Sequence, residues 1–259
     1  MSTLKRRKLN QFLQNHPAGT VITSKHLADS GISNELARVY VASDWLTRIG
    51  RGAYIRTGDI VEWQGALFAL QTQLQLPVHV GGLTAVRLKG FGHDLPLSGE
   101  TVHLFSNGPQ RLPDWFLQHN FGATIACHRS TLFNLPAGAS LSGMTYKGVT
   151  VQVSSPERAV FELLSLVKTN GDFDAARTLF EEFISLRPRE VQRMLEACRF
   201  VRIRRMFLWM AKECGHPWVK HLDASTVDLG AGKRVIYKNG RLDKELQITV
   251  PGNAGEDHV

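Results

Sequence analysis

The sequence is poor in cysteine and contains no long apolar run. Its three cysteines, Cys127, Cys198 and Cys214, are odd in number and widely spaced, which is typical of free thiols in a reducing compartment. No apolar run reaches the roughly 18 residues that a membrane-spanning helix needs. The basic residues near the start are followed by polar side chains from Asn10 to His16 instead of the apolar core of a signal peptide. We therefore expect a cytoplasmic protein that has no membrane partner.

The sequence also lacks the motifs of the common catalytic and cofactor sites. It contains no Walker A motif, no dinucleotide-binding fingerprint and no HExxH motif. Cys214, His216 and His221 form the most metal-like cluster, but zinc sites pair two such ligand groups and no second pair follows. We therefore interpret His216 as a structural histidine and predict a protein that is not an enzyme and holds no cofactor or metal.

Positive charge is concentrated at the amino-terminal end. The whole chain has a net charge of +8, and residues 1–58 hold nine lysines or arginines against three acidic residues, a net +6 that leaves +2 for the other 201 residues. A basic, compact segment beside a nearly neutral body is typical of a nucleic-acid-binding module. Solubility is the alternative explanation for a basic terminus.

The spacing of apolar residues in this segment predicts two helices, and a tight turn follows the second of them. Residues 3–15 carry leucines and a phenylalanine on one face. A second helix over residues 25–30 follows the N-cap candidates Thr23 and Ser24. Gly31 then supplies the positive φ that a tight turn requires.

A third helix is predicted from Ser33, which is its N-cap candidate, to about Ser43. The spacing of Leu36, Val39 and Tyr40 turns these side chains towards the core. Four residues are left facing outward: Asn34, Glu35, Arg38 and Val41. Helix, glycine-containing turn and helix form the helix-turn-helix pattern, whose second helix lies in a major groove of DNA.

Two short strand-like runs, residues 45–49 and 53–56, flank Gly50-Arg51-Gly52 and predict a hairpin with an arginine at its tip. Beside a helix-turn-helix such a hairpin is a wing that contacts phosphates, and Arg51 is placed to enter a minor groove. The alternative is a helix-turn-helix that binds protein, with the hairpin as a plain surface turn. The candidate DNA-binding residues are Lys25, Ser33, Asn34, Arg38, Arg48, Arg51 and Arg56.

Residues 59–259 mix helical and strand patterns. Helices are predicted over residues 60–76, 84–89, 172–185, 188–197 and 203–213, and another begins at Ser155-Pro156-Glu157. Strands are predicted over residues 78–80, 101–105, 123–127, 148–153, 233–237 and 246–250, with a loop over 134–143. The predicted fold class is α+β, with a winged helix-turn-helix in residues 1–58 and a larger mixed α/β domain in residues 59–259.

Four arginines near residue 200 form a second basic cluster. Arginines spaced in this way usually lie on the solvated face of a helix, and contact with nucleic acid or a partner is the less common interpretation. We assign Arg202, Arg204 and Arg205 as a second candidate basic surface.

Residues Tyr40 to Tyr54, with the sequence YVASDWLTRIGRGAY, strongly resemble the N-terminal domain of AbiEi-type antitoxins, which are transcriptional regulators of bacterial type IV toxin-antitoxin systems. Asp44 departs from this pattern, since a small residue or glycine is expected before Trp-Leu. The likeness covers nearly the whole chain, and the other matching segments are His79–Ala85, Ser155–Ala159 and Leu229–Arg234.

This resemblance implies a winged helix that binds repeats in double-stranded promoter DNA and represses its own operon. It also implies a carboxy-terminal domain that counteracts a nucleotidyltransferase-like toxin without needing a stable complex with it, in abortive phage defence or in the maintenance of mobile elements. By position, Arg48, Arg51 and Arg56 match the basic wing, and the recognition helix is matched by Ser33, Asn34 and Arg38.

Two other functions stay open. One is a winged-helix protein with a nuclease-like carboxy-terminal domain, for which Asp223, Asp228 and Lys233 are the nearest metal-binding set. That set lacks a glutamate two residues before a lysine in a following strand. The other is an adaptor that binds only protein.

Overall fold

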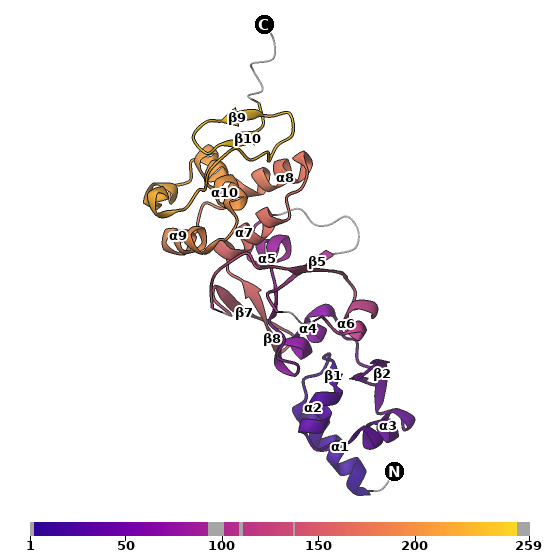
Figure 1. Ribbon diagram of the computed structural model, residues 1–259. Coiled ribbons are helices and arrows are strands. Elements are labelled where there is room, and N and C mark those ends of the chain that lie inside the picture. The colour runs from indigo at the N-terminus through magenta and orange to yellow at the C-terminus, as the bar shows by residue number, and fades with distance from the viewer. Residues whose placement is uncertain (1–2, 93–100, 109–110, 137, 253–259) are drawn as a thin grey trace. The chain divides into compact units, whose positions relative to one another are not determined.

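The computed structural model describes residues 3–92, 101–108, 111–136 and 138–252. The chain forms two compact units (Figure 1). Unit 1 comprises Met1–Val80, Pro96–Arg129 and Ser142–Val153, and unit 2 comprises Gly81–Leu95, Ser130–Leu141 and Ser154–Val259. Because unit 1 continues past residue 58, the predicted domain boundary at that position does not coincide with this division and stays a prediction.

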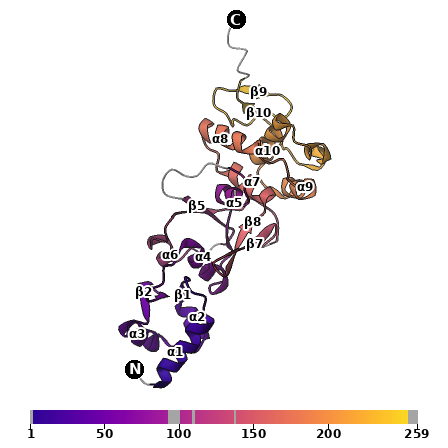
Figure 2. The same ribbon diagram turned by 180° about the vertical axis from the view of Figure 1, so that it is seen from behind.

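The amino-terminal part of unit 1 contains three helices and a three-stranded antiparallel sheet of order β1-β3-β2 (Figures 1 and 2). The elements are α1 (Thr3–Asn15), β1 (Ile22–Thr23), α2 (Ser24–Asp29), α3 (Asn34–Ala42), β2 (Leu46–Gly50) and β3 (Ala53–Arg56). Their shared core consists of Leu9, Leu13, Ile22, Leu27, Ile32, Ala37, Tyr40, Leu46 and Tyr54. Val41, expected to face outward, packs against this core, whereas Val39 is only half-buried and lies outside it.

The rest of unit 1 is built on a five-stranded mixed sheet of order β6-β5-β4-β8-β7. Its elements are α4 (Trp63–Thr72), β4 (Val78–Val80), β5 (Thr101–Ser106), α6 (Asp114–Gln118), β6 (Thr124–Arg129), β7 (Leu141–Tyr146) and β8 (Val149–Ser154). Strand β4 pairs antiparallel with β5 and parallel with β8. The loop expected over 134–143 is wrong for its last three residues, where β7 begins, and α6 was not predicted at all.

Helix α4 and the residue that follows it, Gln73, make close contacts with the backbone of the amino-terminal elements. The buried side-chain amide of Gln73 accepts a hydrogen bond from the Thr23 N–H at 2.8 Å and donates one to the Val21 carbonyl at 2.7 Å. A Cβ at Gly65 would lie 1.9 Å from the carbonyl oxygen of Gly19, so only glycine permits this approach. The Gln73 amide thus continues the hydrogen bonding of β1, which is a short strand.

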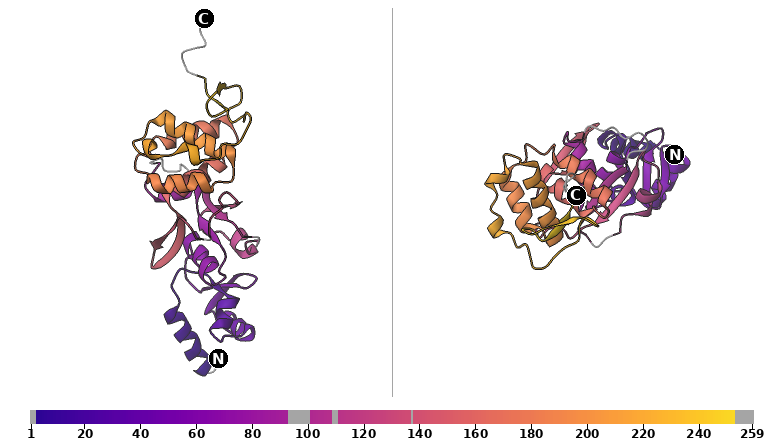
Figure 3. Two further views of the ribbon diagram at one scale, coloured as in Figure 1. Left: turned by 60° about the vertical axis from the view of Figure 1, so that its left-hand side comes forward. Right: turned by 90° about the horizontal axis from the view of Figure 1, so that it is seen from above.

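Unit 2 is mainly helical (Figure 3). Its helices pack around a cluster of aromatic rings. The elements are α5 (Gly82–Leu88), α7 (Pro156–Ser165), α8 (Asn170–Phe180), α9 (Pro188–Ala197), α10 (Val201–Cys214), two short 3-10 turns (Val219–His221 and Ala224–Thr226), β9 (Arg241–Asp243) and β10 (Ile248–Val250). Rings of Phe161 and Phe207 stack with centroids 4.4 Å apart, and Phe180 and Trp218 surround them. His216 is also buried here, with its Nε2 2.7 Å from the Phe180 carbonyl.

The predicted strand over residues 233–237 is wrong. This segment makes one isolated bridge, between Arg234 and Ile248, and the strand that pairs with β10 is β9. Left-handed residues at Gly232 and Asn239 flank this short segment, and its backbone-to-backbone hydrogen bonds to residues 247–249 involve only Arg234 and Tyr237. In the part of the chain that the structure describes, no helix is long and apolar enough to cross a membrane.

Candidate nucleic-acid interface

Helices α2 and α3 are positioned by the caps that the sequence predicts. The Thr23 hydroxyl accepts a hydrogen bond from the His26 N–H at 3.1 Å, and the Ser33 hydroxyl accepts one from the Leu36 N–H at 3.2 Å. Between the helices, Gly31 has a φ of 74°. Its carbonyl accepts a hydrogen bond from the Lys8 ammonium group, which ties α1 to the turn.

The β2–β3 hairpin follows α3 and turns at Arg51 and Gly52. Gly52 has a φ of 73°, and its carbonyl accepts a hydrogen bond from the Ser24 N–H at 2.8 Å. Gly50 is required for a different reason, because a Cβ there would lie 2.6 Å from the Cβ of Trp115 in α6. The hairpin tip is therefore held between the first turn of α2 and helix α6.

A groove of about 540 Å³ lies between α3 and this hairpin. Its lining residues are Ser24, Asn34, Arg38, Val41, Ala42, Arg48, Arg51, Gly52 and Tyr54. Four of the seven predicted DNA-binding residues, Asn34, Arg38, Arg48 and Arg51, are therefore brought together. Ser24 and Tyr54 were missed; Ser24 was noticed only as a helix cap, and no sequence signal marked Tyr54.

The groove is electropositive. Arg38, Arg48 and Arg51 are all exposed, and none of the residues lining the groove is acidic. The Arg48 Nε donates to the Gly50 carbonyl at 3.1 Å, which holds this side chain along the hairpin. Neither Arg38 nor Arg51 forms an ion pair with any acidic residue in the described part of the chain. Exposed guanidinium groups of this kind retain their donors for an incoming anion.

One acidic side chain lies close to the groove without lining it. Hydrogen bonds from its own N–H and from the Ser33 hydroxyl lower the pKa of Glu35, and the nearby Arg38 adds to this effect. Glu35 is therefore ionised at neutral pH and partly offsets the charge of Arg38. The net electrostatic attraction depends most on Arg48 and Arg51.

Two family models match adjacent parts of the sequence. Residues 5–97 match the model described as transcriptional regulator, AbiEi antitoxin N-terminal domain, and residues 99–251 match that of transcriptional regulator, AbiEi antitoxin, type IV TA system. The chain belongs to the AbiEi antitoxin family. The resemblance inferred from the sequence is confirmed.

The fold of this AbiEi protein is similar to that of a solved structure, the RV2827C protein from Mycobacterium tuberculosis. The TM-score is 0.58 at 13% sequence identity, and the match covers 96% of this chain and 91% of that chain. A likeness at this level of identity demonstrates a shared fold. No curated protein matches the sequence.

Three of the predicted DNA-binding residues of this AbiEi protein lie outside the groove. Lys25 forms an ion pair with Asp29 at 2.8 Å on the outer face of α2, and the Ser33 hydroxyl is used as the cap of α3. Arg56 donates from Nη2 to the Leu13 carbonyl at 2.5 Å. It satisfies a carbonyl in the last turn of α1, where a cation also interacts favourably with the helix dipole.

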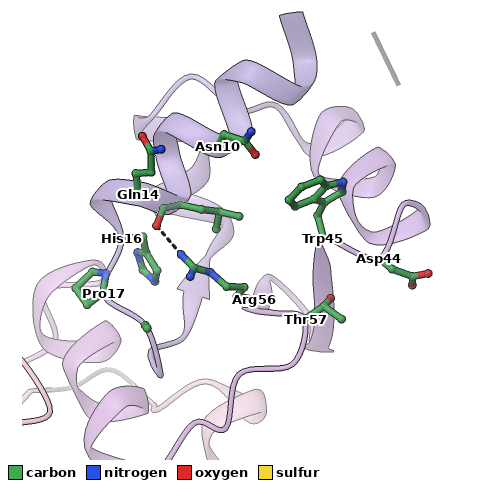
Figure 4. Close-up of a pocket in the computed structure, with 10 residues that line it drawn as sticks. Asn10, Gln14, His16, Pro17, Asp44, Trp45, Arg56 and Thr57 are labelled. Carbon is green, nitrogen blue, oxygen red and sulfur yellow. Dashed lines mark hydrogen bonds between the residues drawn. The ribbon is translucent and has the colours of Figure 1, made fainter. Parts of the chain in front are cut away.

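Arg56 instead lines a second groove of about 830 Å³, which includes Asn10, Gln14, His16, Asp44 and Trp45 (Figure 4). Figure 4 shows Asn10 and Gln14 on α1, with Trp45 and Asp44 across the opening. Asp44 has a φ of 55°, so its backbone is left-handed. This conformation explains why glycine is expected there and why aspartate, which tolerates it, is accepted.

The prediction of a second basic surface at Arg202, Arg204 and Arg205 is wrong for two of the three. Arg204 and Arg205 are only 7% and 2% exposed. Arg202 is half-buried and donates to the Val167 carbonyl at 2.9 Å. The cluster lies in the first turns of α10, which pack into unit 2, so the guanidinium groups of Arg202 and Arg205 bind backbone carbonyls and that of Arg204 lies 3.8 Å from the Asp228 carboxylate.

Proposed function

We propose that residues 1–58 form a winged helix-turn-helix that binds double-stranded promoter DNA. In this proposal α3 is the recognition helix, and the β2–β3 hairpin is the wing. The proposal is supported by the groove between them, which gathers Asn34, Arg38, Arg48 and Arg51 without an acidic lining residue. An arginine-lined groove beside a capped helix suits phosphate contacts, and the amide of Asn34 suits base contacts.

We further propose that the protein represses its own operon by binding repeats in the promoter, and that it is a non-enzymatic antitoxin. The family descriptions name both a transcriptional regulator and a type IV antitoxin. On this view the carboxy-terminal residues counteract a nucleotidyltransferase-like toxin, and a stable complex between the two proteins is not required. Cellular rescue from that toxin by residues 59–259 alone would support this assignment.

The test of DNA binding compares the DNA upstream of the gene with scrambled DNA of equal length, in a salt series. We expect tighter binding to the upstream DNA. Arg51→Ala should weaken binding to both sequences and reduce the slope of log affinity against log salt by about one. Asn34→Ala should weaken binding to the upstream DNA alone, because it removes a base contact rather than a phosphate contact.

Arg189→Ala is the matched control, since Arg189 is exposed on α9 and its loss removes the same charge. Equal affinity of the wild-type protein for the two DNAs would defeat the repressor proposal. No measurable binding at low salt would favour the protein-binding adaptor instead. Metal-dependent cleavage of the DNA would favour the nuclease-like alternative.

A further inference from the structure

The buried guanidinium group of Arg205 organises an exposed glycine-rich loop in unit 2. The Arg205 side chain donates from Nε to the Leu229 carbonyl at 2.7 Å, from Nη2 to the Gly230 carbonyl at 2.9 Å, and from Nη1 to the Gly232 carbonyl at 2.7 Å. Its Nη1 also lies 3.2 Å from the Gln247 carbonyl. We call residues Leu229–Arg234 the glycine loop. The Arg205 side chain thus orients three carbonyl groups of the glycine loop towards itself.

Inward carbonyls force the neighbouring N–H groups outward. The C=O and N–H of a trans peptide unit point in opposite directions, and the described chain contains no cis peptide. The N–H groups of Ala231 and Lys233 follow the inward carbonyls of Gly230 and Gly232, so they point away from Arg205. Both residues are exposed, and neither N–H donates to an acceptor in the described part of the chain.

Two glycines permit this arrangement. Gly230 and Gly232 have φ values of 57° and 76°, in the left-handed region that side chains disfavour. A Cβ on Gly230 would also lie 2.9 Å from a methyl group of Val201 at the start of α10. Turns with left-handed residues that present several backbone N–H groups to one side can bind anions, and here the outward N–H groups are those of the alternate residues Ala231 and Lys233.

The side chains around the glycine loop add positive charge. Lys233 and Arg234 are exposed, and the Arg234 Nη1 lies 3.1 Å from the Lys233 carbonyl and 3.4 Å from the Gly232 carbonyl. Two guanidinium groups, those of Arg205 and Arg234, therefore converge on the Gly232 carbonyl. Two like charges at one carbonyl are unfavourable unless a counter-charge is supplied.

The nearest acidic residue, Asp228, does not supply enough negative charge to balance these cations. Asp228 accepts a hydrogen bond from the Gly230 N–H at 2.8 Å and lies 3.8 Å from the Arg204 Nη2. Arg204 is itself buried, and its Nε has no hydrogen-bond partner among the described residues. Against Asp228 stand four cations, Arg204, Arg205, Lys233 and Arg234, so these five residues together carry a net charge of +3.

We propose that the glycine loop binds a phosphate group. The outward N–H groups of Ala231 and Lys233 bind two of its oxygens, and the side chains of Lys233 and Arg234 neutralise its charge. An excess of three positive charges suits a multiply charged phosphate better than a single carboxylate. The phosphate group belongs to an inorganic phosphate, a free nucleotide or the end of a single-stranded RNA, and the three probes below distinguish these sources. The site is distinct from the arginine groove and does not depend on the proposed DNA binding.

The test measures binding of three probes to the full-length protein by calorimetry: inorganic pyrophosphate, ATP and a 5′-phosphorylated 12-nucleotide RNA. We expect the wild-type protein to bind at least one probe, and the double variant Lys233→Ala/Arg234→Ala to bind it at least tenfold more weakly. The matched control is Lys220→Ala/Lys244→Ala, which removes the same charge from exposed positions of unit 2 and should retain binding. Comparable binding of pyrophosphate and ATP identifies the phosphate group as the ligand, whereas binding of RNA alone identifies a strand.

A third variant, Arg205→Gln, keeps both exposed cations and removes the anchor of the loop. It should also lose phosphate affinity, measured well below its thermal midpoint, because Arg205 is a positioning residue. No binding of any probe by the wild-type protein at millimolar concentration and low salt would overturn the proposal. Equal losses in the double variant and its matched control would overturn it too, because they would indicate general electrostatics. The promoter-DNA affinity of Lys233→Ala/Arg234→Ala should be unchanged, which separates this test from that of the proposed function.

Discussion

Arginines around the groove of the amino-terminal elements and arginines in the interior of unit 2 are used in opposite ways. Around the groove, Arg38, Arg48 and Arg51 are exposed and meet no acidic lining residue. In unit 2, Arg158 and Arg205 are buried, and their donors are occupied by a carboxylate or by carbonyl groups. A buried guanidinium that lacked such partners would cost several kcal/mol, whereas an exposed one keeps its donors free for a ligand.

This difference shows that the environment of an arginine, rather than the density of arginines in the sequence, indicates whether it is available to a partner. Residues 3–58 form short helices around a small core, which leaves most of their side chains on the surface. Helix α10 packs against other elements of unit 2, so even its residues Arg204 and Arg205 are buried. The three predictions below test each side of the comparison, from the largest expected effect to the smallest.

The first prediction concerns a buried carboxylate of unit 2 that accepts three hydrogen bonds. The buried Glu162 accepts hydrogen bonds from the Ser154 hydroxyl at 2.7 Å, the Arg158 Nε at 2.8 Å and the Gly82 N–H at 3.2 Å. Glu162→Ala leaves the buried Arg158 charge without a carboxylate and frees the Gly81-Gly82 turn. We expect a loss of about 3 to 5 kcal/mol in the free energy of unfolding, measured by urea denaturation.

Arg51→Ala serves as the comparison from the groove and should change this free energy by less than about 0.5 kcal/mol. Replacing both partners, as in Glu162→Met/Arg158→Met, should restore part of the loss, since no buried charge is then left unpaired. If Glu162→Ala were as stable as the wild-type protein, unit 2 would tolerate an unpaired arginine and the contrast between the two regions would disappear.

The sequence was most informative where local chemistry decides the structure. The caps at Thr23, Ser33 and Ser155 form as expected, and helix α9 spans its predicted residues, because these features depend on a few adjacent residues. Strand β7 was missed because an edge strand such as LSGMTY has little apolar alternation. The extent of unit 1 was not visible either, since it depends on contacts such as Gln73 with Val21 and Thr23, about 50 residues apart.

Part of the candidate nucleic-acid interface could also be predicted, because it depends on residues that are close in the sequence. Asn34, Arg38, Arg48 and Arg51 reach one groove because α3 and the adjacent hairpin fix their directions over a short stretch of chain. Arg56 belongs to the same hairpin, yet its side chain turns to the carbonyl of Leu13. A charge pattern cannot reveal that a carbonyl 43 residues away will accept its hydrogen bond.

The second prediction concerns a basic side chain that the amino-terminal core keeps neutral. Burial lowers the pKa of His16 to about 4, and the nearby His26 contributes. The Thr20 hydroxyl donates to the Pro17 carbonyl at 2.7 Å, so it accepts from the His16 Nε2 at 2.7 Å, and the buried Nδ1 lacks a partner among the described atoms. This residue therefore resists protonation in the folded state.

Because the pKa is lower in the folded state than the unfolded value of about 6.5, the unfolded chain binds the extra proton between pH 6.5 and 4. The stability that neutral His16 contributes is complete above pH 6.5 and is lost as the pH falls towards 4. Between pH 7.5 and 4.5 the wild-type protein should lose roughly 2 to 3 kcal/mol more than His16→Gln. His221→Gln, at an exposed histidine, should lose as much as the wild-type protein, and an unchanged pH dependence in His16→Gln would contradict the assignment.

The third prediction tests where the amino-terminal region ends, and so where the comparison itself should be drawn. Gln73→Ala removes the acceptor of the Thr23 N–H and the donor to the Val21 carbonyl. Both backbone groups are buried, so we expect a loss of about 2 kcal/mol and faster hydrogen exchange of the Thr23 amide. Gln73→Glu keeps only the acceptor, and burial beside the Val21 carbonyl should raise the pKa of the new carboxyl group. Its penalty should therefore shrink as the pH falls, because the protonated acid again donates to Val21. If neither substitution altered exchange at Thr23, the elements before residue 58 would be stable without α4, and the boundary inferred from the sequence would be the physical one.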